Sequence, residues 1–341
     1  MASSQYGQRK VAKTPAWWAI GAFFTALVGL RHEVGADWGT YLRHLTEVLG
    51  VSLGAALSEG HGDPAYVFVN WLAGILGWGV YGTNTICALL FMSGLLFFCA
   101  KQPNPWLALA VSVPYLVIVV AMGYTRQSVA IGLSMFALIA LSHGQMYKFA
   151  FWVLLAALFH KTAVVLLILP ILLSSGAWWW RVPLMGGLLL LAYKALLQDS
   201  VESLENEYLV AQYASSGAAI RIAMNALPAV VFLIFINRFR LNRVTRKVWW
   251  LLAWAVLLAI PVLVASPSST AVDRISLYLI PLQIFVWSRV PGLRLVGNVN
   301  IGKLLVLSYS ASVLFVWLIF ADNSLYWHPY NSILLIWLSA M

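Results

Sequence analysis

Charged residues are scarce in this sequence. Only 9% of its 341 residues are Asp, Glu, Lys or Arg, whereas 62% are hydrophobic and the mean hydropathy is +0.85. Soluble domains carry roughly 25% charged residues, and a chain with so few could not cover a surface that faces water. The composition therefore excludes a soluble globular enzyme, a disordered protein and a fibrous protein, and it leaves an integral membrane protein.

The sequence also lacks the motifs of several common sites. Its two cysteines, Cys87 and Cys99, lie in one apolar run, so neither a disulfide framework nor a cysteine-based metal site is supported. There is no Asp-x-Asp, no His-x-x-Glu-His and no carboxylate cluster at ligand spacing, which argues against catalysis by a divalent metal. No Walker A or dinucleotide-binding motif occurs. We therefore expect no metal and no cofactor.

Long apolar runs dominate what is present. Several reach the roughly 20 residues that a helix needs to cross a bilayer, and they lack the alternation of β-barrel strands. We expect an all-α polytopic membrane protein, one transmembrane domain over residues 1–341, with about 11–12 membrane helices that include re-entrant or short ones. The predicted spans are 15–30, which no signal-peptide cleavage site follows, and 84–100, 105–122, 126–142, 177–197, 219–236, 248–265, 274–290 and 302–320.

Three further stretches are ambiguous. Residues 64–82 either span the membrane or lie re-entrant or along its interface. Residues 147–175 form either one tilted helix or two short ones that meet near His160, and residues 331–341 are too few to cross.

The distribution of basic residues predicts the orientation. Lys and Arg number 21 against 11 Asp and Glu, a formal net charge of +10, which in a membrane protein indicates cytoplasmic Lys and Arg and not nucleic-acid binding. With a cytoplasmic N-terminus (1–14), a non-crossing 64–82 and a hairpin at 147–175, the basic loop 237–247 lies inside and every acidic residue lies outside. A single crossing at 147–175 would put that loop outside, against the positive-inside rule. The hairpin is therefore favoured, and segments 31–82, with its interfacial or re-entrant helices, and 198–218 are predicted outer-face loops.

A minority of basic residues remains on the predicted outer side: Arg31, Arg43, Arg126, Lys161, Lys194, Arg221 and Arg274. A charge beside a span is energetically costly and asks for a reason. The arginines Arg31, Arg126, Arg221 and Arg274 stand at the outer ends of different predicted helices. They either reach head groups or pair with Asp37 and Asp273, or they form a cationic pocket whose planar guanidinium groups grip phosphate with two bonds.

Two titratable groups on this side are candidates for proton transfer. His160, beside Lys161, has an unperturbed pKa near neutrality and can act as a general base or acid. The alternative is a histidine that hydrogen-bonds a neighbouring helix. Asp37 is either a second base or an arginine partner. The outer aromatic residues Tyr41, Tyr66, Trp327 and Tyr330 are candidates for stacking on sugars, against a role in the interfacial aromatic belt.

Several segments resemble, in order, those of the EpsG family of bacterial exopolysaccharide polymerases, a Wzy-like group. They are Gly29-Leu30-Arg31 with Val34-Gly35-Ala36-Asp37 and Tyr41, Asp63-Pro64-Ala65-Tyr66 through Asn70, Arg126-Gln127 through Ala130, Ala156 through Ala163, Ser216-Gly217 with Arg221, Asp273-Arg274-Ile275 with Tyr278, and Trp327 with Pro329-Tyr330. The resemblance covers nearly the whole chain. Asp63 stands where the family usually has Glu, Ala36 where Thr is common, and Lys161 where an aromatic residue is frequent.

The resemblance implies a helical fold related to the lipid-dependent, membrane-embedded (GT-C-like) glycosyltransferases. It implies a multi-pass protein of the bacterial inner membrane that joins repeat units carried on polyprenyl pyrophosphate at the periplasmic face, after a flippase has delivered them. The expected partners are the lipid-linked oligosaccharide, the bilayer, a flippase and a chain-length regulator, and the lipid carrier is part of the substrate.

Under this hypothesis His160 is the base, Asp37 is the second choice, and Arg274 is also required for catalysis. Arg126, Arg221 and Arg274 would hold pyrophosphate with help from Arg31 and Lys161. Asp273 and Tyr278 join the four aromatic residues named above as the expected sugar-binding set. An O-antigen-type ligase, a lipid-linked oligosaccharide transporter or flippase, a non-catalytic assembly subunit of the secretion system and an O-acyltransferase that uses His160 remain alternatives.

Overall fold

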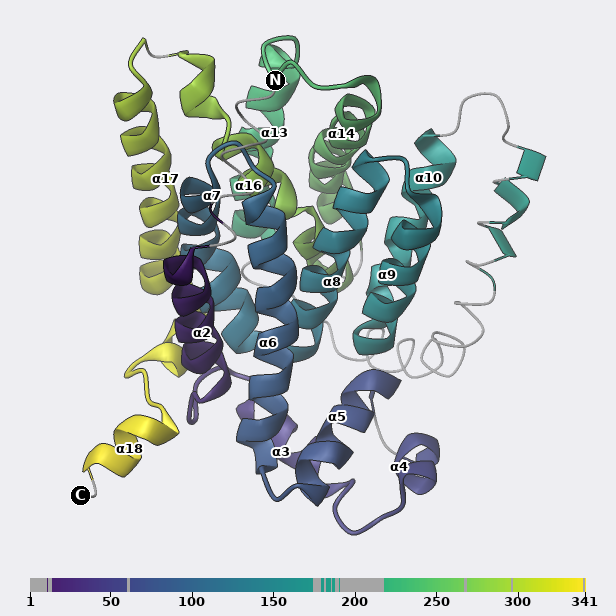
Figure 1. The fold of residues 1–341 in the computed structure, drawn as a ribbon, viewed down its shortest axis with the longest axis vertical. Coiled ribbons are helices and arrows are strands. Elements are labelled where there is room, and N and C mark those ends of the chain that lie inside the picture. The colour runs from purple at the N-terminus through teal and green to yellow at the C-terminus, as the bar shows by residue number, and fades with distance from the viewer. Residues whose placement is uncertain are drawn as a thin grey trace.

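The computed structural model describes residues 14–59, 62–173, 218–266, 269–295 and 297–339, with residues 11 and 341 and short stretches between 179 and 190. Every regular element in these ranges is a helix (Figure 1). Most of the predicted cytoplasmic N-terminus (1–14), most of the predicted span 177–197 and nearly all of the predicted outer loop 198–218 lie outside the described residues.

Four helices are long and apolar enough to cross a membrane, namely α6 (Gly79–Ala100), α8 (Thr125–Ser142), α14 (Arg243–Ala265) and α17 (Val299–Phe320). Shorter apolar helices stand beside them: α2 (Pro15–Gly29), α5 (Pro64–Ile75), α7 (Pro105–Ser112) continued by the wide-turned η1 (Val113–Ala121), α9 (Met146–Phe159), η2 (Lys161–Leu167) continued by α10 (Ile168–Leu173), and α13 (Ala218–Phe235). These helices confirm the prediction of an all-α polytopic membrane protein.

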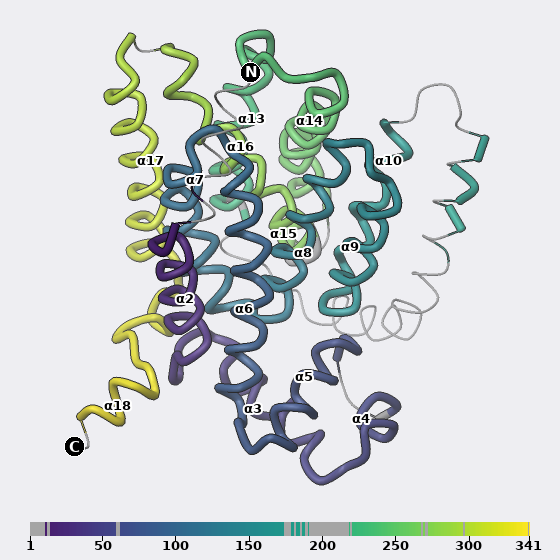
Figure 2. Tube along the Cα trace, in the orientation of Figure 1, coloured from purple at the N-terminus to yellow at the C-terminus, as the bar shows by residue number. Residues whose placement is uncertain are grey.

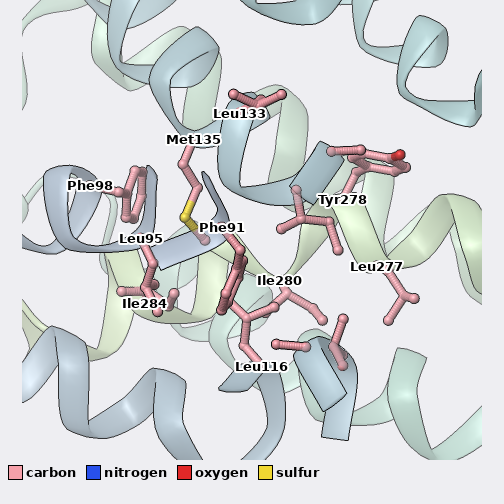
Figure 3. Packing of buried hydrophobic residues seen from close by; sticks show 14 of the residues in the cluster. Phe91, Leu95, Phe98, Leu116, Leu133, Met135, Leu277, Tyr278, Ile280 and Ile284 are labelled. Carbon is pink, nitrogen blue, oxygen red and sulfur yellow. The ribbon is translucent and has the colours of Figure 1, made fainter. Parts of the chain in front are cut away.

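Helices α6 and α8 form the centre of the bundle (Figure 2). A Cβ atom placed on Gly94 would lie 2.0 Å from the carbonyl oxygen of Gly132, so the two backbones are in direct contact. In a bilayer, where lipid is as apolar as the helices, such close packing of small residues is a main source of association. Buried side chains from α6, η1, α8 and α16 (Pro281–Trp287) interlock around this contact, as Figure 3 shows for Phe91, Leu116 and Ile284.

One end of the bundle carries the small helices α3 (Trp38–Thr46), α4 (Leu53–Glu59) and α5, which lie at the bottom of Figure 1. Helix α5 covers only part of the ambiguous stretch 64–82. The chain turns at Gly77 and Gly79, whose φ values of +68° and +58° favour glycine, and α6 begins there. The C-terminal α18 (Ile333–Ser339) is a short helix at the same end. We call this end of the bundle the site end.

The chain reverses direction at His160. Helix α9 ends at Phe159, His160 is extended (φ −158°, ψ 109°), and the η2–α10 segment then runs back along the bundle. At the other end of this segment, the Lys247 ammonium in the first turn of α14 donates to the Leu173 carbonyl at 3.0 Å. The structure thus shows the two-helix alternative for residues 147–175.

Basic loops gather at the opposite end, which we call the basic end. The turn between α13 and α14 lies at the top of Figure 1 and contains Arg238 and Arg240. The connections α6–α7 and α16–α17, the last including η4 (Val290–Leu293), hold further basic residues, and Lys148 lies just after the connection α8–α9, in the first turn of α9. Of the described acidic residues, none lies in these four connections. This separation of charge by bundle end is the pattern on which the predicted orientation rests.

The predicted span 274–290 is helical but is not one regular α-helix. The structure has three short helices in its place: α15 (Ser269–Ser276), η3 (Leu277–Leu279) and α16. Proline has no backbone N–H, and its ring clashes with the preceding turn of a helix, so Pro281 begins a new helix and does not continue the old one. The break lets α15 contact the η2 segment near the site end.

Candidate functional site

Asp63 links three separate elements at the site end. Its Oδ1 accepts the backbone N–H of Lys161 at 3.1 Å. Its Oδ2 lies 3.4 Å from Arg126 Nη1 and 3.6 Å from His160 Nδ1. Asp63 occupies the N-cap position of α5, yet its side chain caps no helical N–H, because it reaches across to the turn between α9 and η2. We call Asp63, Arg126, His160 and Lys161 the Asp63 cluster.

The cluster favours an ionised carboxylate beside a neutral imidazole. Burial disfavours the charge on Asp63, but His160, Arg126 and the Lys161 amide outweigh burial and lower the pKa of the carboxyl below its usual value. Burial lowers the pKa of His160, although the Asp63 carboxylate opposes that shift. At neutral pH His160 is therefore able to accept a proton, and the nearby negative charge of Asp63 would stabilise the imidazolium that forms.

The ring of His160 is only partly engaged. The side chain is buried, Nδ1 has the Asp63 carboxylate oxygen at 3.6 Å, and Nε2 makes no hydrogen bond within the described part of the chain. Buried polar groups are nearly always hydrogen-bonded, and those that are not call for a functional explanation. The observation weighs against a histidine that serves only to bridge two helices.

Arg126 and Arg274 bring positive charge to the same place. The Arg126 side chain is 29% exposed, and its guanidinium carbon lies 5.6 Å from the centre of the Tyr66 ring. Arg274 is exposed on α15. Its backbone carbonyl accepts a hydrogen bond from the Gln127 side-chain amide, and this bond links α15 to α8. Both arginines interact electrostatically with the half-buried Asp37, whose pKa is raised by burial.

Arg221 is engaged in a buried ion pair. Its Nε and Nη2 atoms donate to the two carboxylate oxygens of Asp273, and both side chains are less than a tenth exposed. A guanidinium that holds one carboxylate with two bonds offers fewer donors to a second anion. The structure thus shows the acid-pairing alternative for Arg221, and Asp273 is the partner.

Arg31 packs inside the protein. It is fully buried, and it donates to the carbonyls of Val28 and Val34 and, at 2.7 Å, to the Thr125 hydroxyl. The backbone of Arg31 also pairs with the backbone of Ser332 as an isolated antiparallel β-bridge, which joins the end of α2 to the segment before α18. The prediction that Arg31 binds phosphate has no support in this geometry.

The predicted sugar-stacking aromatics form the walls of the site and do not present open faces. Four of them are buried: Tyr41, Tyr66, Tyr278 and Trp327. The Tyr41 hydroxyl donates to the Gly123 carbonyl at 3.0 Å and accepts the Thr125 amide at 2.9 Å, which fixes the start of α8. The hydroxyl of the partly buried Tyr330 donates to the Leu27 carbonyl at 2.7 Å. Of these contacts, those of Tyr41 position the start of α8, the helix that carries Arg126.

Gly35 brings Asp37 close to the start of α8. Its φ is +100°, and a Cβ atom there would lie 2.7 Å from the Met122 carbonyl oxygen. Only glycine combines that backbone conformation with so close an approach. The positive φ and the close packing against Met122 therefore explain why residue 35 is glycine.

Asp63 is the site residue that sequence reasoning missed. The charge pattern placed it on the outer side and the family resemblance included its segment, but neither gave it a role. Within the described residues, no three His, Cys, Asp or Glu side chains lie close enough together to hold a metal ion.

Comparison with known proteins gives one match. The model of the EpsG family matches residues 16–332, nearly the whole chain and all of the site described above. Neither the search of curated proteins nor the search of solved structures found a match.

Proposed function

The chain belongs to the EpsG family, and on that premise we propose that it polymerises oligosaccharide repeat units carried on polyprenyl pyrophosphate. The protein would lie in the bacterial inner membrane with its N-terminus in the cytoplasm and its site end at the periplasmic face. The separation of charge between the two ends of the bundle supports this orientation, because Lys- and Arg-rich loops remain cytoplasmic.

The proposed reaction is one glycosyl transfer. A hydroxyl oxygen of the acceptor repeat attacks the anomeric carbon of the growing chain, and the bond between that carbon and the pyrophosphate oxygen breaks. The acceptor proton passes to His160, and polyprenyl pyrophosphate leaves as an anion. Because pyrophosphate is already a good leaving group, the protein mainly positions the substrates and stabilises charge.

The buried ring of His160, whose Nδ1 faces the Asp63 carboxylate and whose Nε2 has no hydrogen-bond partner among the described residues, is the observation that carries the proposal. A carboxylate next to one ring nitrogen stabilises the imidazolium that forms when the other nitrogen takes a proton. Asp37 is the second candidate for the base, because its raised pKa brings it closer to neutrality.

Arg126 and Arg274 are the proposed pyrophosphate ligands. Both are more accessible than the other two predicted arginines, and both act on the same carboxylate, Asp37. Lys161, half-buried next to His160, adds positive charge. In this proposal Arg221 contributes only electrostatically and from a distance, since its guanidinium already donates two hydrogen bonds to the Asp273 carboxylate.

The test is polymerisation in proteoliposomes that contain the purified protein and a lipid-linked repeat unit, with product length read on a gel. His160→Ala and Arg274→Ala are each expected to abolish the polymer ladder while the protein stays folded and inserted. Lys148→Ala, an exposed change on the first turn of α9 at the basic end, is the matched control and should leave the ladder intact. A full ladder from His160→Ala together with none from Asp37→Ala would assign the base to Asp37.

The same assay separates the alternatives. A single transfer to a different lipid acceptor, with no ladder, would indicate a ligase. Movement of the lipid-linked repeat across the membrane with its length unchanged would indicate a transporter. Ester groups appearing on the sugar would indicate an acyltransferase, and each of these results would overturn the proposal.

A further inference from the structure

A cavity opens at the basic end, away from the Asp63 cluster. Its volume is about 440 Å³, and its walls come from α13 and α14. The lining divides into two kinds of side chain, apolar ones and basic ones: Leu233, Ile236 and Trp250, then Arg243, Arg246 and Lys247. Beyond the cavity residue Trp250, helix α14 extends about 22 Å further toward the site end, at about 1.5 Å per residue.

The positive charge in the cavity is not neutralised by acid. Arg246 donates to the Asn237 side-chain carbonyl at 2.9 Å, and Lys247 donates to the Leu173 backbone carbonyl at 3.0 Å. Both bonds hold the basic groups in place without removing charge. None of the three basic lining residues forms an ion pair with an acid among the described residues.

The apolar wall continues onto the surface that faces lipid. Trp250 is 41% exposed, and Trp254, one turn further along α14, is 43% exposed with its ring centre 6.1 Å away. Trp250 lies about 10 Å along α14 from its first residue, and Trp254 lies at the midpoint of the helix, so both follow the basic residues that begin it. A ligand in the cavity would therefore meet fixed positive charge at one end and membrane hydrocarbon at the other.

We propose that this cavity binds an anionic glycerophospholipid of the inner leaflet. The lipid phosphate would lie between Arg243, Arg246 and Lys247, and one acyl chain would follow Ile236 and Trp250 along the outside of the bundle. A soluble phosphate would satisfy the basic residues but would leave the apolar wall without a partner. The positive-inside rule accounts for basic residues at this end, but it does not account for three of them lining one cavity with an apolar wall.

The experiment measures which lipid stays with the purified protein. The protein is extracted from nanodiscs that contain equal amounts of phosphatidylglycerol and phosphatidylcholine, and retained lipid is counted by native mass spectrometry. The cavity variant carries Arg243→Gln, Arg246→Gln and Lys247→Gln. The control variant removes the same charge from exposed positions at the basic end outside the cavity: Lys101→Gln, Arg238→Gln and Lys303→Gln.

The expected result is a preference for phosphatidylglycerol that falls about tenfold or more in the cavity variant and less than about twofold in the control, since the three cavity charges would act together on one bound phosphate whereas the control charges are spread over separate connections. Ile236→Trp, which narrows the cavity and keeps every charge, should also reduce the preference. Equal losses in the cavity and control variants would show diffuse attraction only and would overturn the proposal.

Two further outcomes would also overturn it. The proposal fails if Ile236→Trp retains as much phosphatidylglycerol as the unaltered protein, or if millimolar inorganic phosphate displaces the lipid. Should the cavity variant fail to fold, Arg243→Gln alone, which removes no hydrogen bond to a described residue, replaces it in the same comparison. Because the readout is retained lipid, the result does not depend on the polymerase activity.

Discussion

Replacing Asp63 with Asn would remove the negative charge beside His160 and keep a hydrogen-bond acceptor for Lys161. At 3.6 Å and an effective dielectric constant of about 20, a unit charge pair attracts by roughly 4–5 kcal/mol, which is the gross stabilisation that Asp63 offers to an imidazolium at His160. After desolvation, an opposite charge at this range shifts a pKa by about one to three units. We therefore expect the Asp63→Asn enzyme to polymerise roughly 10- to 1000-fold more slowly.

The pH dependence gives the more specific readout. Asp63 raises the pKa of His160, so its loss lowers that pKa further. His160 acts as a base only when neutral, and activity is lost as pH falls through its pKa. In the Asp63→Asn enzyme the acid limb of the pH–rate profile is therefore expected to move to lower pH by about one to three units.

The assay is the initial rate of ladder formation in proteoliposomes across the acid limb, with size-exclusion and thermal unfolding as checks of the fold. The lost ion pair with the partly exposed Arg126 is worth about 1 kcal/mol or less, so the variant should stay folded. Asp63→Glu keeps the charge and should retain most of the activity. A wild-type rate together with an unmoved acid limb in Asp63→Asn would refute the assignment of His160 as the base.

Other changes test separate parts of the structure. Arg126→Lys keeps the charge but loses the planar fork, and it should raise the KM for the lipid pyrophosphate about tenfold while kcat changes less. Arg221→Ala removes the arginine that pairs with the buried Asp273 carboxylate and should lower the free energy of unfolding by about 3–5 kcal/mol. Arg221→Met combined with Asp273→Leu removes both charges and should recover folded protein. Full activity in that recovered variant would exclude Arg221 from the pyrophosphate site. Gly94→Ala places a methyl group against the α8 backbone and should lower the melting temperature through about 1–3 kcal/mol of overpacking, while Gly39→Ala, with nothing within 4 Å of its Cβ, should leave it unchanged.

Hydropathy and charge were sufficient to predict the class of fold and the turn at His160. A helical span is a local property of about 20 residues, so it can be predicted without knowing what packs against it. The turn followed from orientation, because only a hairpin at 147–175 keeps the basic loop 237–247 with the other basic loops. The irregular helix within 274–290 was not predicted, because hydropathy averages over Pro281, whereas a proline removes one helical hydrogen bond at that point.

The roles of the arginines could not be predicted, because each depends on a partner distant in the sequence. Arg31 and Arg126 look alike in the sequence, as basic residues at helix ends on one side. In the structure Arg31 is enclosed by carbonyls and by Thr125, which lies 94 residues away, whereas Arg126 meets Asp63 at 3.4 Å. Hydropathy contains no information about such distant pairings.

The difference between Arg126 and Arg221 shows which pairing leaves a cation available to a ligand. Asp273 gives both of its oxygens to Arg221, and both side chains are buried, so the pair is closed. Asp63 divides its two oxygens among Arg126, His160 and the Lys161 amide, and the Arg126 side chain is 29% exposed. A carboxylate shared in this way cannot neutralise Arg126 fully, so that arginine keeps donors for a phosphate while the same carboxylate stabilises His160. This sharing would allow a bundle end with several acidic residues to bind the proposed anionic substrate.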